Sequence, residues 1–124
     1  MKLLPIFLVL IILSGCSHEV NTGYRKITPR EAQAMMHDDV IILDVRTEEE
    51  YAEGHIPHAV LLADYDIKEH AATVIADKNQ TILVYCKGGS RSEKAAKELI
   101  DMGYTEVFDF GGIVDWEGEI VKIP

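Results

Sequence analysis

The apolar residues of this chain form continuous runs in some regions and are spaced three or four positions apart in others. Short continuous runs rich in β-branched and aromatic residues predict strands that are buried on both faces. Strands are predicted at residues 40–43, 60–62, 81–85 and 107–108. The pair Gly111-Gly112 is expected to end the last of them, because glycine weakens a strand interior.

Helices are predicted between these strands. Thr28 suits the N-cap, Pro29 the first helical position and Glu31 the third position of a capping box, so a helix should run from here to residue 36 or 37. Further helices are predicted at residues 48–53, 66–76 and 92–102, the last capped by Gly103. The helix at residues 66–76 should turn Ile67, Ala71, Val74 and Ile75 toward the core. Alternating strands and helices predict an α/β fold, a doubly wound parallel sheet with helices on both faces.

The chain begins with Lys2 and an apolar run over residues 3–13. Eleven helical residues rise only about 16 Å, too little to span a bilayer, and their position is typical of a signal peptide. The run ends in Leu13-Ser14-Gly15-Cys16, which resembles the lipobox of bacterial lipoproteins, in which the cysteine is diacylated and becomes the new N-terminus. The alternative is an ordinary secreted protein with an unrelated cysteine.

Three segments follow from this interpretation. Residues 1–15 are expected to be a lipoprotein signal peptide, residues 16–26 a lipidated N-terminus and polar tether, and residues 27–124 a single domain. Lipid on Cys16 would place that domain in the cell envelope, outside the cytoplasm and anchored to a membrane. The net charge of −9, with 12 basic and 21 acidic residues, argues against a nucleic-acid partner.

Two candidate functional residues lie where predicted strands end. Asp44 follows residues 40–43 and Cys86 follows residues 81–85, and the carboxyl ends of parallel strands meet at one edge, where ligands bind. With Cys16 lipidated, Cys86 has no disulfide partner. The five histidines lack the spacing of metal ligands, so neither a metal nor an organic cofactor is expected.

The residues after Cys86 form a basic, glycine-rich loop. Gly88 and Gly89 let backbone N–H groups point inward, while Lys87 and Arg91 add positive charge and a helix begins near Ser92. These features favour a thiolate at Cys86. Cys86 is the predicted nucleophile, and the expected substrate-binding residues are Lys87, Gly88, Gly89, Ser90, Arg91 and Ser92.

Several motifs together resemble single rhodanese domains. The matching stretches are Leu43-Asp44-Val45-Arg46, Glu50-Tyr51, Gly54-His55-Ile56-Pro57 with Ala59, the Cys86 loop, and Gly103-Tyr104, Val107, Gly111-Gly112 and Trp116. The resemblance covers about residues 25–118. It implies the rhodanese fold and sulfur transfer through a persulfide on Cys86. Sulfane sulfur from a small anionic donor, thiosulfate or a persulfide, would pass to a thiol or another thiophilic acceptor.

Other functions fit less well. Cysteine-dependent phosphatases place five residues between the nucleophile and the arginine, whereas four separate Cys86 from Arg91, which favours sulfur over phosphate. A thiol redox protein is disfavoured because no second cysteine can resolve a mixed disulfide. A sulfur-carrying or partner-binding module with little turnover is the alternative.

Residues near the loop allow two interpretations each. Asp44 and Arg46 either shape the site or form a structural ion pair, and the second is favoured. Arg91 either binds the donor or folds back onto Glu50 or Glu53. His58 stands where the family usually has glycine, and a positive φ there would cost about 1 kcal/mol.

Overall fold

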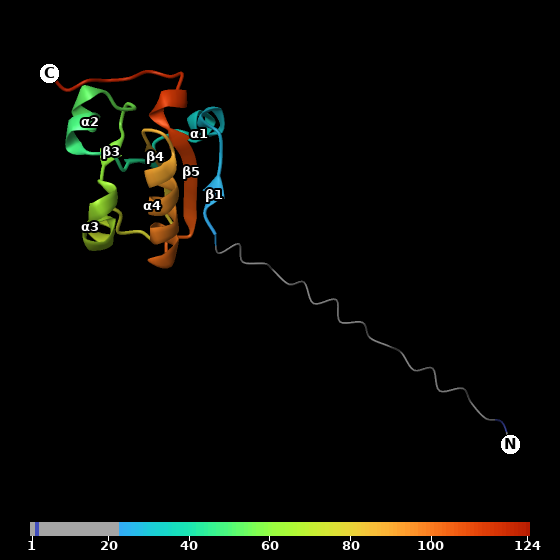
Figure 1. Cartoon of the computed structure of the whole chain (residues 1–124). Helices are drawn as coiled ribbons and strands as arrows, with labels where there is room; N and C mark the ends of the chain where they lie inside the picture. The colour runs from blue at the N-terminus through green and yellow to red at the C-terminus, as the bar shows by residue number, and fades with distance from the viewer. Residues whose placement is uncertain (1, 3–22) are drawn as a thin grey trace.

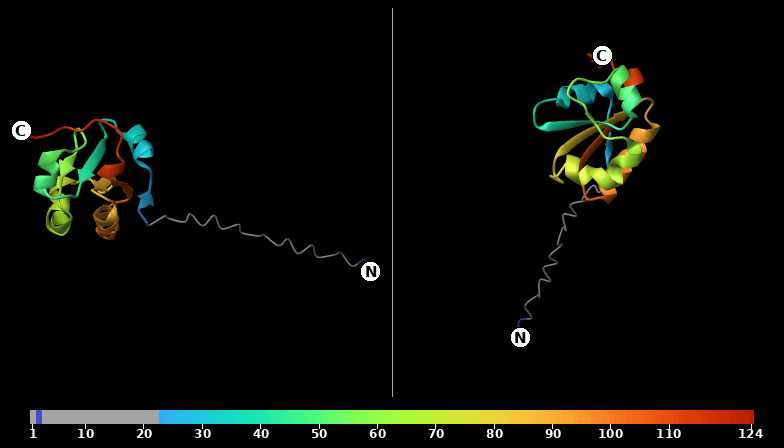
Figure 2. Two further views of the ribbon diagram at one scale, coloured as in Figure 1. Left: turned by 45° about the horizontal axis from the view of Figure 1, so that its top comes forward. Right: turned by 90° about the vertical axis from the view of Figure 1, so that its left-hand side faces the viewer.

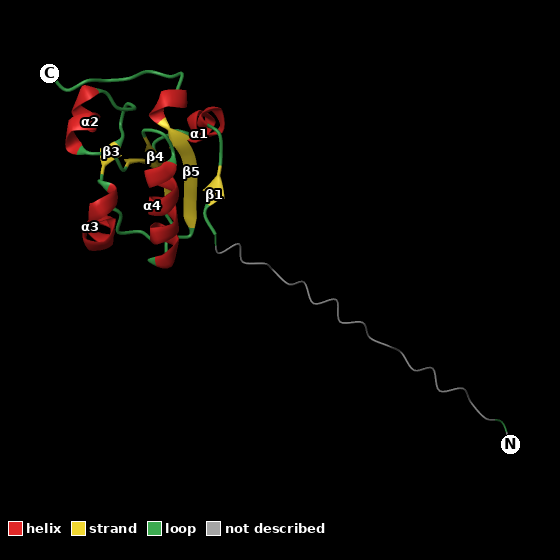
Figure 3. Cartoon of the chain, viewed as in Figure 1, coloured by secondary structure: helices red, strands yellow, loops and turns green. Residues whose placement is uncertain are grey.

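The computed structural model describes residue 2 and residues 23–124, in which five strands form one parallel sheet in the order β1-β5-β4-β2-β3 (Figure 1). The strands are β1 (Arg25–Lys26), β2 (Val40–Asp44), β3 (Val60–Leu61), β4 (Thr81–Cys86) and β5 (Glu106–Gly112). The helices are α1 (Pro29–Met35), α2 (Glu48–Glu53), α3 (Ile67–Val74) and α4 (Ser90–Asp101), with short 3₁₀ turns at Asp64–Asp66 and Ile113–Asp115. Figure 3 shows how helices alternate with strands.

Helices cover both faces of the sheet. Seen edge-on, α1 lies on one side and the pair α3 and α4 on the other (Figure 2, right). β4 runs through the centre, and its residues from Ile82 to Cys86 are buried, alternating between the two faces. Ile82, Val84 and Cys86 pack toward α3 and α4, whereas Leu83 and Tyr85 pack toward α1. The predicted doubly wound α/β fold is confirmed.

Capping explains where two short helices begin. At α1 the Glu31 N–H donates to the Thr28 hydroxyl at 3.1 Å, and the Glu31 carboxylate accepts from the Thr28 N–H at 3.3 Å. Thr47 and Glu50 form the same capping box at α2. Each box satisfies donors that the first helical turn leaves without partners. The predicted starts at Thr28 and Glu48 are confirmed.

The sheet includes more residues than predicted, both at its first strand, β1, and at its last, β5. Arg25 and Lys26, assigned to the tether, form β1 and pair with β5. β5 was expected to stop at Phe108 but continues through Gly112. The strand tolerates its glycines because a bulge lies there. Val84 pairs with Asp109 but Cys86 with Gly112, and Gly111 adopts a φ of 86°, which favours glycine.

Two helix predictions need correction. α4 begins at Ser90, two residues before the predicted start, because Gly89 takes a left-handed N-cap conformation that turns the chain directly into the helix. Val74 was expected to face the core, but it is 41% exposed, because α3 ends at this residue and the chain leaves the helical path before Ile75. The predicted leader and Cys16 lie outside the described residues. Among residues that are described, no helix is long and apolar enough to cross a membrane.

Candidate active site

The predicted site residues gather at the carboxyl end of the sheet. Asp44 ends β2, Cys86 ends the neighbouring β4, and Gly112 ends β5 on the other side of β4. The chain leaves β2 toward β3 and leaves the adjacent β4 toward β5, on opposite sides, an arrangement that opens a crevice at the strand ends. Cys86 therefore lies at the centre of the edge where a doubly wound fold places its ligands.

The Cys86 thiol lies against the start of α4. Its Sγ accepts a hydrogen bond from the Gly89 N–H at 3.0 Å, and the side chain is only 1% exposed. Gly89 has a φ of 108°, so a side chain there would strain the turn that delivers this N–H. The 12-residue α4 directs the positive end of its dipole toward the sulfur. The arrangement stabilises negative charge on a sulfur atom at this point.

The end of β5 packs against the loop that follows Cys86. A Cβ atom on Gly112 would lie 2.2 Å from the Lys87 carbonyl oxygen, so only glycine lets the two segments approach this closely. The Ser92 hydroxyl donates to the Gly89 carbonyl at 3.0 Å and lies 3.3 Å from the Gly111 carbonyl. Ser92 is fully buried and connects the loop to β5. Ser92 and Gly112 therefore hold the loop in shape.

Asp109 is a further buried residue that sequence reasoning missed. Its Oδ1 accepts from the Gly111 N–H at 2.9 Å and so fixes the bulge opposite Cys86. The other oxygen, Oδ2, is buried without a hydrogen-bond partner among the described residues. A charged residue inside the apolar run 107–110 was the available signal, because a strand buried on both faces rarely carries one.

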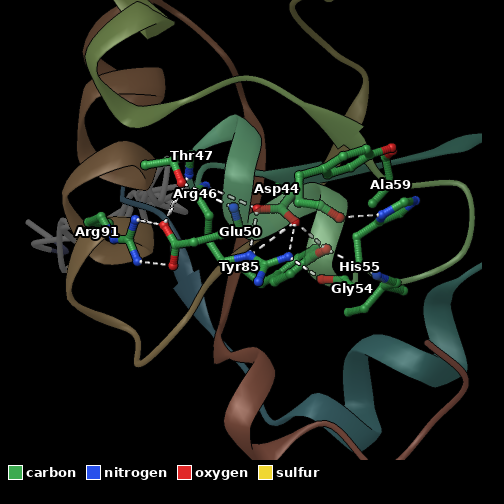
Figure 4. A network of polar contacts seen from close by, with 11 residues as sticks. Asp44, Arg46, Thr47, Glu50, Gly54, His55, Ala59, Tyr85 and Arg91 are labelled. Carbon is green, nitrogen blue, oxygen red and sulfur yellow. Dashed lines mark hydrogen bonds and ion pairs between the residues drawn. The ribbon is translucent and has the colours of Figure 1, made fainter. Parts of the chain in front are cut away.

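Asp44 and Arg46 form a buried ion pair within a polar network (Figure 4). Arg46 Nη2 lies 2.7 Å from Asp44 Oδ2 and also donates to the Gly54 carbonyl at 2.7 Å. The Tyr85 hydroxyl donates to Asp44 Oδ2 at 2.6 Å and accepts from the Ile56 N–H at 3.1 Å. The network joins β2, β4 and the chain after α2, which agrees with the favoured structural interpretation.

The pKa directions in this network reflect burial and pairing. Burial lowers the pKa of Arg46, but its hydrogen bond to Asp44 and the charge of that carboxylate outweigh burial, so the pKa is raised overall. Burial also raises the pKa of Tyr85 far above its ordinary value, and the Asp44 carboxylate raises it further. Both directions favour a charged Arg46 and a neutral Tyr85 at neutral pH.

Arg91 folds back onto Glu50 rather than lying free in the loop. Its Nη1 and Nη2 donate to Glu50 Oε1 and Oε2 at 2.7 and 2.9 Å, a bidentate pair visible in Figure 4. The hydrogen bond with Arg91 lowers the pKa of Glu50 from 4.5 to about 2. The same bond raises the pKa of Arg91, and the charge of Cys86 raises it further, so the pair lies within electrostatic reach of the thiol.

Lys87 is the remaining cation of the loop. It is exposed and has no ion pair among residues 23–124. It borders a cavity of about 230 Å³ whose wall includes Arg46, Glu50, Ile113 and Val114. The cavity adjoins the loop directly after Cys86 and is large enough for a small anion.

Several features lie apart from this site. A larger cavity of about 650 Å³, lined by Met36, Ile42 and Trp116 among others, contains none of the predicted site residues. His55 stacks on Tyr51 at 3.7 Å between ring centroids, which is a packing contact. His58 has a φ of 67°, the strained conformation considered for it. Within the described residues, no cluster of three His, Cys, Asp or Glu side chains could hold a metal ion.

Comparison with known proteins agrees with this geometry. The family model "Rhodanese-like domain" matches residues 28–119. The chain is 41% identical over 73 residues to thiosulfate sulfurtransferase PspE of Escherichia coli, covering 59% of this chain and 70% of that protein. It is 34% identical over 96 residues to thiosulfate sulfurtransferase GlpE of Coxiella burnetii, covering 76% and 88%.

A solved structure extends the comparison to three dimensions. The structure described as "rhodanese with anions from E. coli" superposes with a TM-score of 0.63 at 39% sequence identity, covering 66% of this chain and 96% of that one. The matched family model includes β2, the Cys86 loop and the end of β5, which together form the site. The chain belongs to the rhodanese-like domain family and is a rhodanese-type sulfurtransferase.

Proposed function

We propose that this sulfurtransferase moves sulfane sulfur from a small anionic donor, thiosulfate or a persulfide, to a thiol or another thiophilic acceptor through a persulfide on Cys86. The observation that carries the proposal is the Cys86 Sγ, which accepts the Gly89 N–H at 3.0 Å at the start of α4. This position favours an anionic sulfur, both as the attacking thiolate and as the product persulfide.

The transfer takes two steps that balance without a cofactor. The Cys86 thiolate attacks the outer sulfur of thiosulfate, the sulfur–sulfur bond of the donor breaks, and sulfite leaves with the bonding electron pair. Cys86 then carries an anionic persulfide. A thiolate or cyanide attacks the outer sulfur of that persulfide, which releases an organic persulfide or thiocyanate and returns the Cys86 thiolate.

Protein groups contribute position and charge rather than proton transfer. The Gly89 N–H and the α4 dipole stabilise the sulfur anion, and Lys87, the loop cation that has no ion pair among residues 23–124, attracts the donor. Ser92 and Gly112 hold the loop in shape. A general base is unnecessary because a thiolate attacks sulfur directly.

Cys86→Ser tests the proposal. With thiosulfate as donor and cyanide as acceptor, the purified full-length protein should form thiocyanate, and the variant should form none above background. Intact mass after donor treatment should show an adduct of about 32 Da, one sulfur atom, only in the wild type. Turnover in the variant would contradict the mechanism. An adduct that no acceptor removes would identify a sulfur carrier instead.

We also propose that the enzyme works outside the cytoplasm on a lipid anchor at Cys16. The support is Lys2, the apolar run 3–13 and the lipobox-like residues before Cys16. Cys16→Ser should abolish labelling by a fatty-acid analogue and release the protein from the membrane fraction, while sulfur transfer by the purified variant stays unchanged. Membrane association that survives the substitution would contradict the anchor.

A further inference from the structure

We propose that Glu50 sets the donor specificity of the site by occupying Arg91, so that the enzyme favours alkyl persulfides over donors with a charged oxyanion group such as thiosulfate. The inference rests on the proposed sulfur transfer at Cys86. It assigns a specificity-determining role to a residue of α2 that contacts Arg91 in the first turn of α4.

The first argument is the geometry of the pair. Both terminal nitrogens of Arg91 donate to both oxygens of Glu50, at 2.7 and 2.9 Å. Two parallel charge-assisted hydrogen bonds use the guanidinium edge that an oxyanion would otherwise take. A sulfonate group entering the site would therefore have to displace a carboxylate that is already in place.

The second argument is that Glu50 is held in position without Arg91. Its Oε1 accepts from both the N–H and the hydroxyl of Thr47 at 3.1 Å, while its own N–H donates to the Thr47 hydroxyl at 3.2 Å. These bonds belong to the N-terminal cap of α2. The carboxylate thus reaches Arg91 from a fixed support, and a donor cannot simply push it aside.

The third argument is the charge left near the thiol. Glu50 neutralises Arg91, and Asp44 neutralises Arg46, so Lys87 remains as the cation of this region without an ion pair among the described residues. Thiosulfate carries two negative charges and must lose water to reach the buried Cys86. An alkyl persulfide carries at most one, on the reacting sulfur itself. The charge balance favours the second donor.

Glu50→Gln removes the negative charge that holds Arg91, with little change in shape. The amide oxygen can take the place of Oε1 and keep the bonds from Thr47. The amide nitrogen then takes the place of Oε2, where it cannot accept from Arg91 Nη2, so the bidentate and charged pair is reduced to one neutral hydrogen bond at most. Glu49→Gln is the matched control, because Glu49 is an exposed neighbour on the same helix with the same charge and no ion pair among the described residues. Glu50→Ala also removes the charge and gives an independent reading if the glutamine variant does not fold.

The measurement is the rate of Cys86 persulfide formation, followed by intact mass at several concentrations of thiosulfate or of a small alkyl persulfide. Glu50→Gln should lower the apparent Kd for thiosulfate about tenfold, the change expected from one additional charge-assisted hydrogen bond. The maximal loading rate should stay nearly constant, and loading from the persulfide should change less than about twofold. Glu49→Gln should behave as the wild type.

The outcomes distinguish the two proposals. A wild-type protein that loads from neither donor contradicts the proposed function itself. A wild type that loads from both, with a donor preference that Glu50→Gln leaves unchanged or that Glu49→Gln shifts equally, overturns the role of Glu50 alone.

Discussion

Two carboxylate–guanidinium pairs stand on either side of the site, and they differ mainly in burial. Asp44 and Arg46 are 0% and 6% exposed at their side chains, with further bonds from Tyr85 and to Gly54. Glu50 and Arg91 are 23% and 32% exposed, and among the described residues Glu50 has only the Thr47 cap as further support. Each pair has a short contact of 2.7 Å, so distance alone does not separate them.

Burial decides what each pair can do. In the interior, an ion left without its partner is costly, so the inner pair, Asp44 with Arg46, is needed for the fold and stays closed during turnover. At the site entrance water screens the charges, and a pair there contributes little to stability. The outer pair, Glu50 with Arg91, is therefore not required for stability. We assign the outer pair to donor specificity and the inner pair to the stability of the fold.

The largest expected effect comes from breaking the inner pair. Arg46→Met leaves the Asp44 carboxylate buried without a counter-ion and should lower the free energy of unfolding by about 3–5 kcal/mol. The matched change at the outer pair, Arg91→Met, should cost less than about 1 kcal/mol. Urea denaturation of both variants measures the contrast. Equal losses would contradict the division between scaffold and specificity.

A smaller effect is expected from the tyrosine that supports the inner pair. Tyr85→Phe removes a hydrogen bond to the Asp44 carboxylate and leaves the buried Ile56 N–H without its acceptor, which should cost about 1–3 kcal/mol in urea denaturation. Tyr51→Phe is the control, since its hydroxyl donates to the neutral carbonyl of Ala59 in a partly buried place. If Tyr51→Phe lowers the free energy of unfolding as much as Tyr85→Phe does, the charge of Asp44 is not what strengthens the hydrogen bond from Tyr85.

Much of the fold was predictable because local patterns and burial agree in it. The capping box at Thr28 begins a helix where it predicts one, α2 spans the residues predicted for it, and the β-branched run at β4 forms the buried central strand. The errors fall where tertiary contacts override local preference. β1 is a strand only because β5 offers a free edge to Arg25 and Lys26, and β5 continues through its glycines because Cys86 pairs across a bulge.

The site was predictable in its nucleophile and less so in its surroundings. A free cysteine before two glycines is a local signal, so Cys86 and its loop could be read from adjacent residues. The partner of Arg91 could not be chosen between Glu50 and Glu53, because both lie on one short helix and only the three-dimensional path selects between them. Asp109 was missed for the same reason: its role depends on a bulge that pairing creates.

The smallest expected effect is the pH dependence of the outer pair. The hydrogen bond to Arg91 lowers the pKa of Glu50 in the folded protein to about 2, from 4.5. A carboxylate with a lowered folded-state pKa stabilises the fold fully above its unfolded value and loses this contribution as the pH falls toward the folded value. Because water screens the pair, its contribution at pH 6 should be only about 1 kcal/mol.

The measurement compares urea denaturation of the wild type and of Glu50→Gln from pH 6 to pH 2. The wild type should be the more stable at pH 6, and its advantage should shrink between pH 4.5 and 2 as Glu50 takes up a proton. Glu49→Gln should show no such convergence, because no ion pair holds Glu49 among the described residues. An advantage that stays constant with pH would mean that the charge of Glu50 does not cause it, and the pair with Arg91 would then contribute nothing measurable to the stability of the fold.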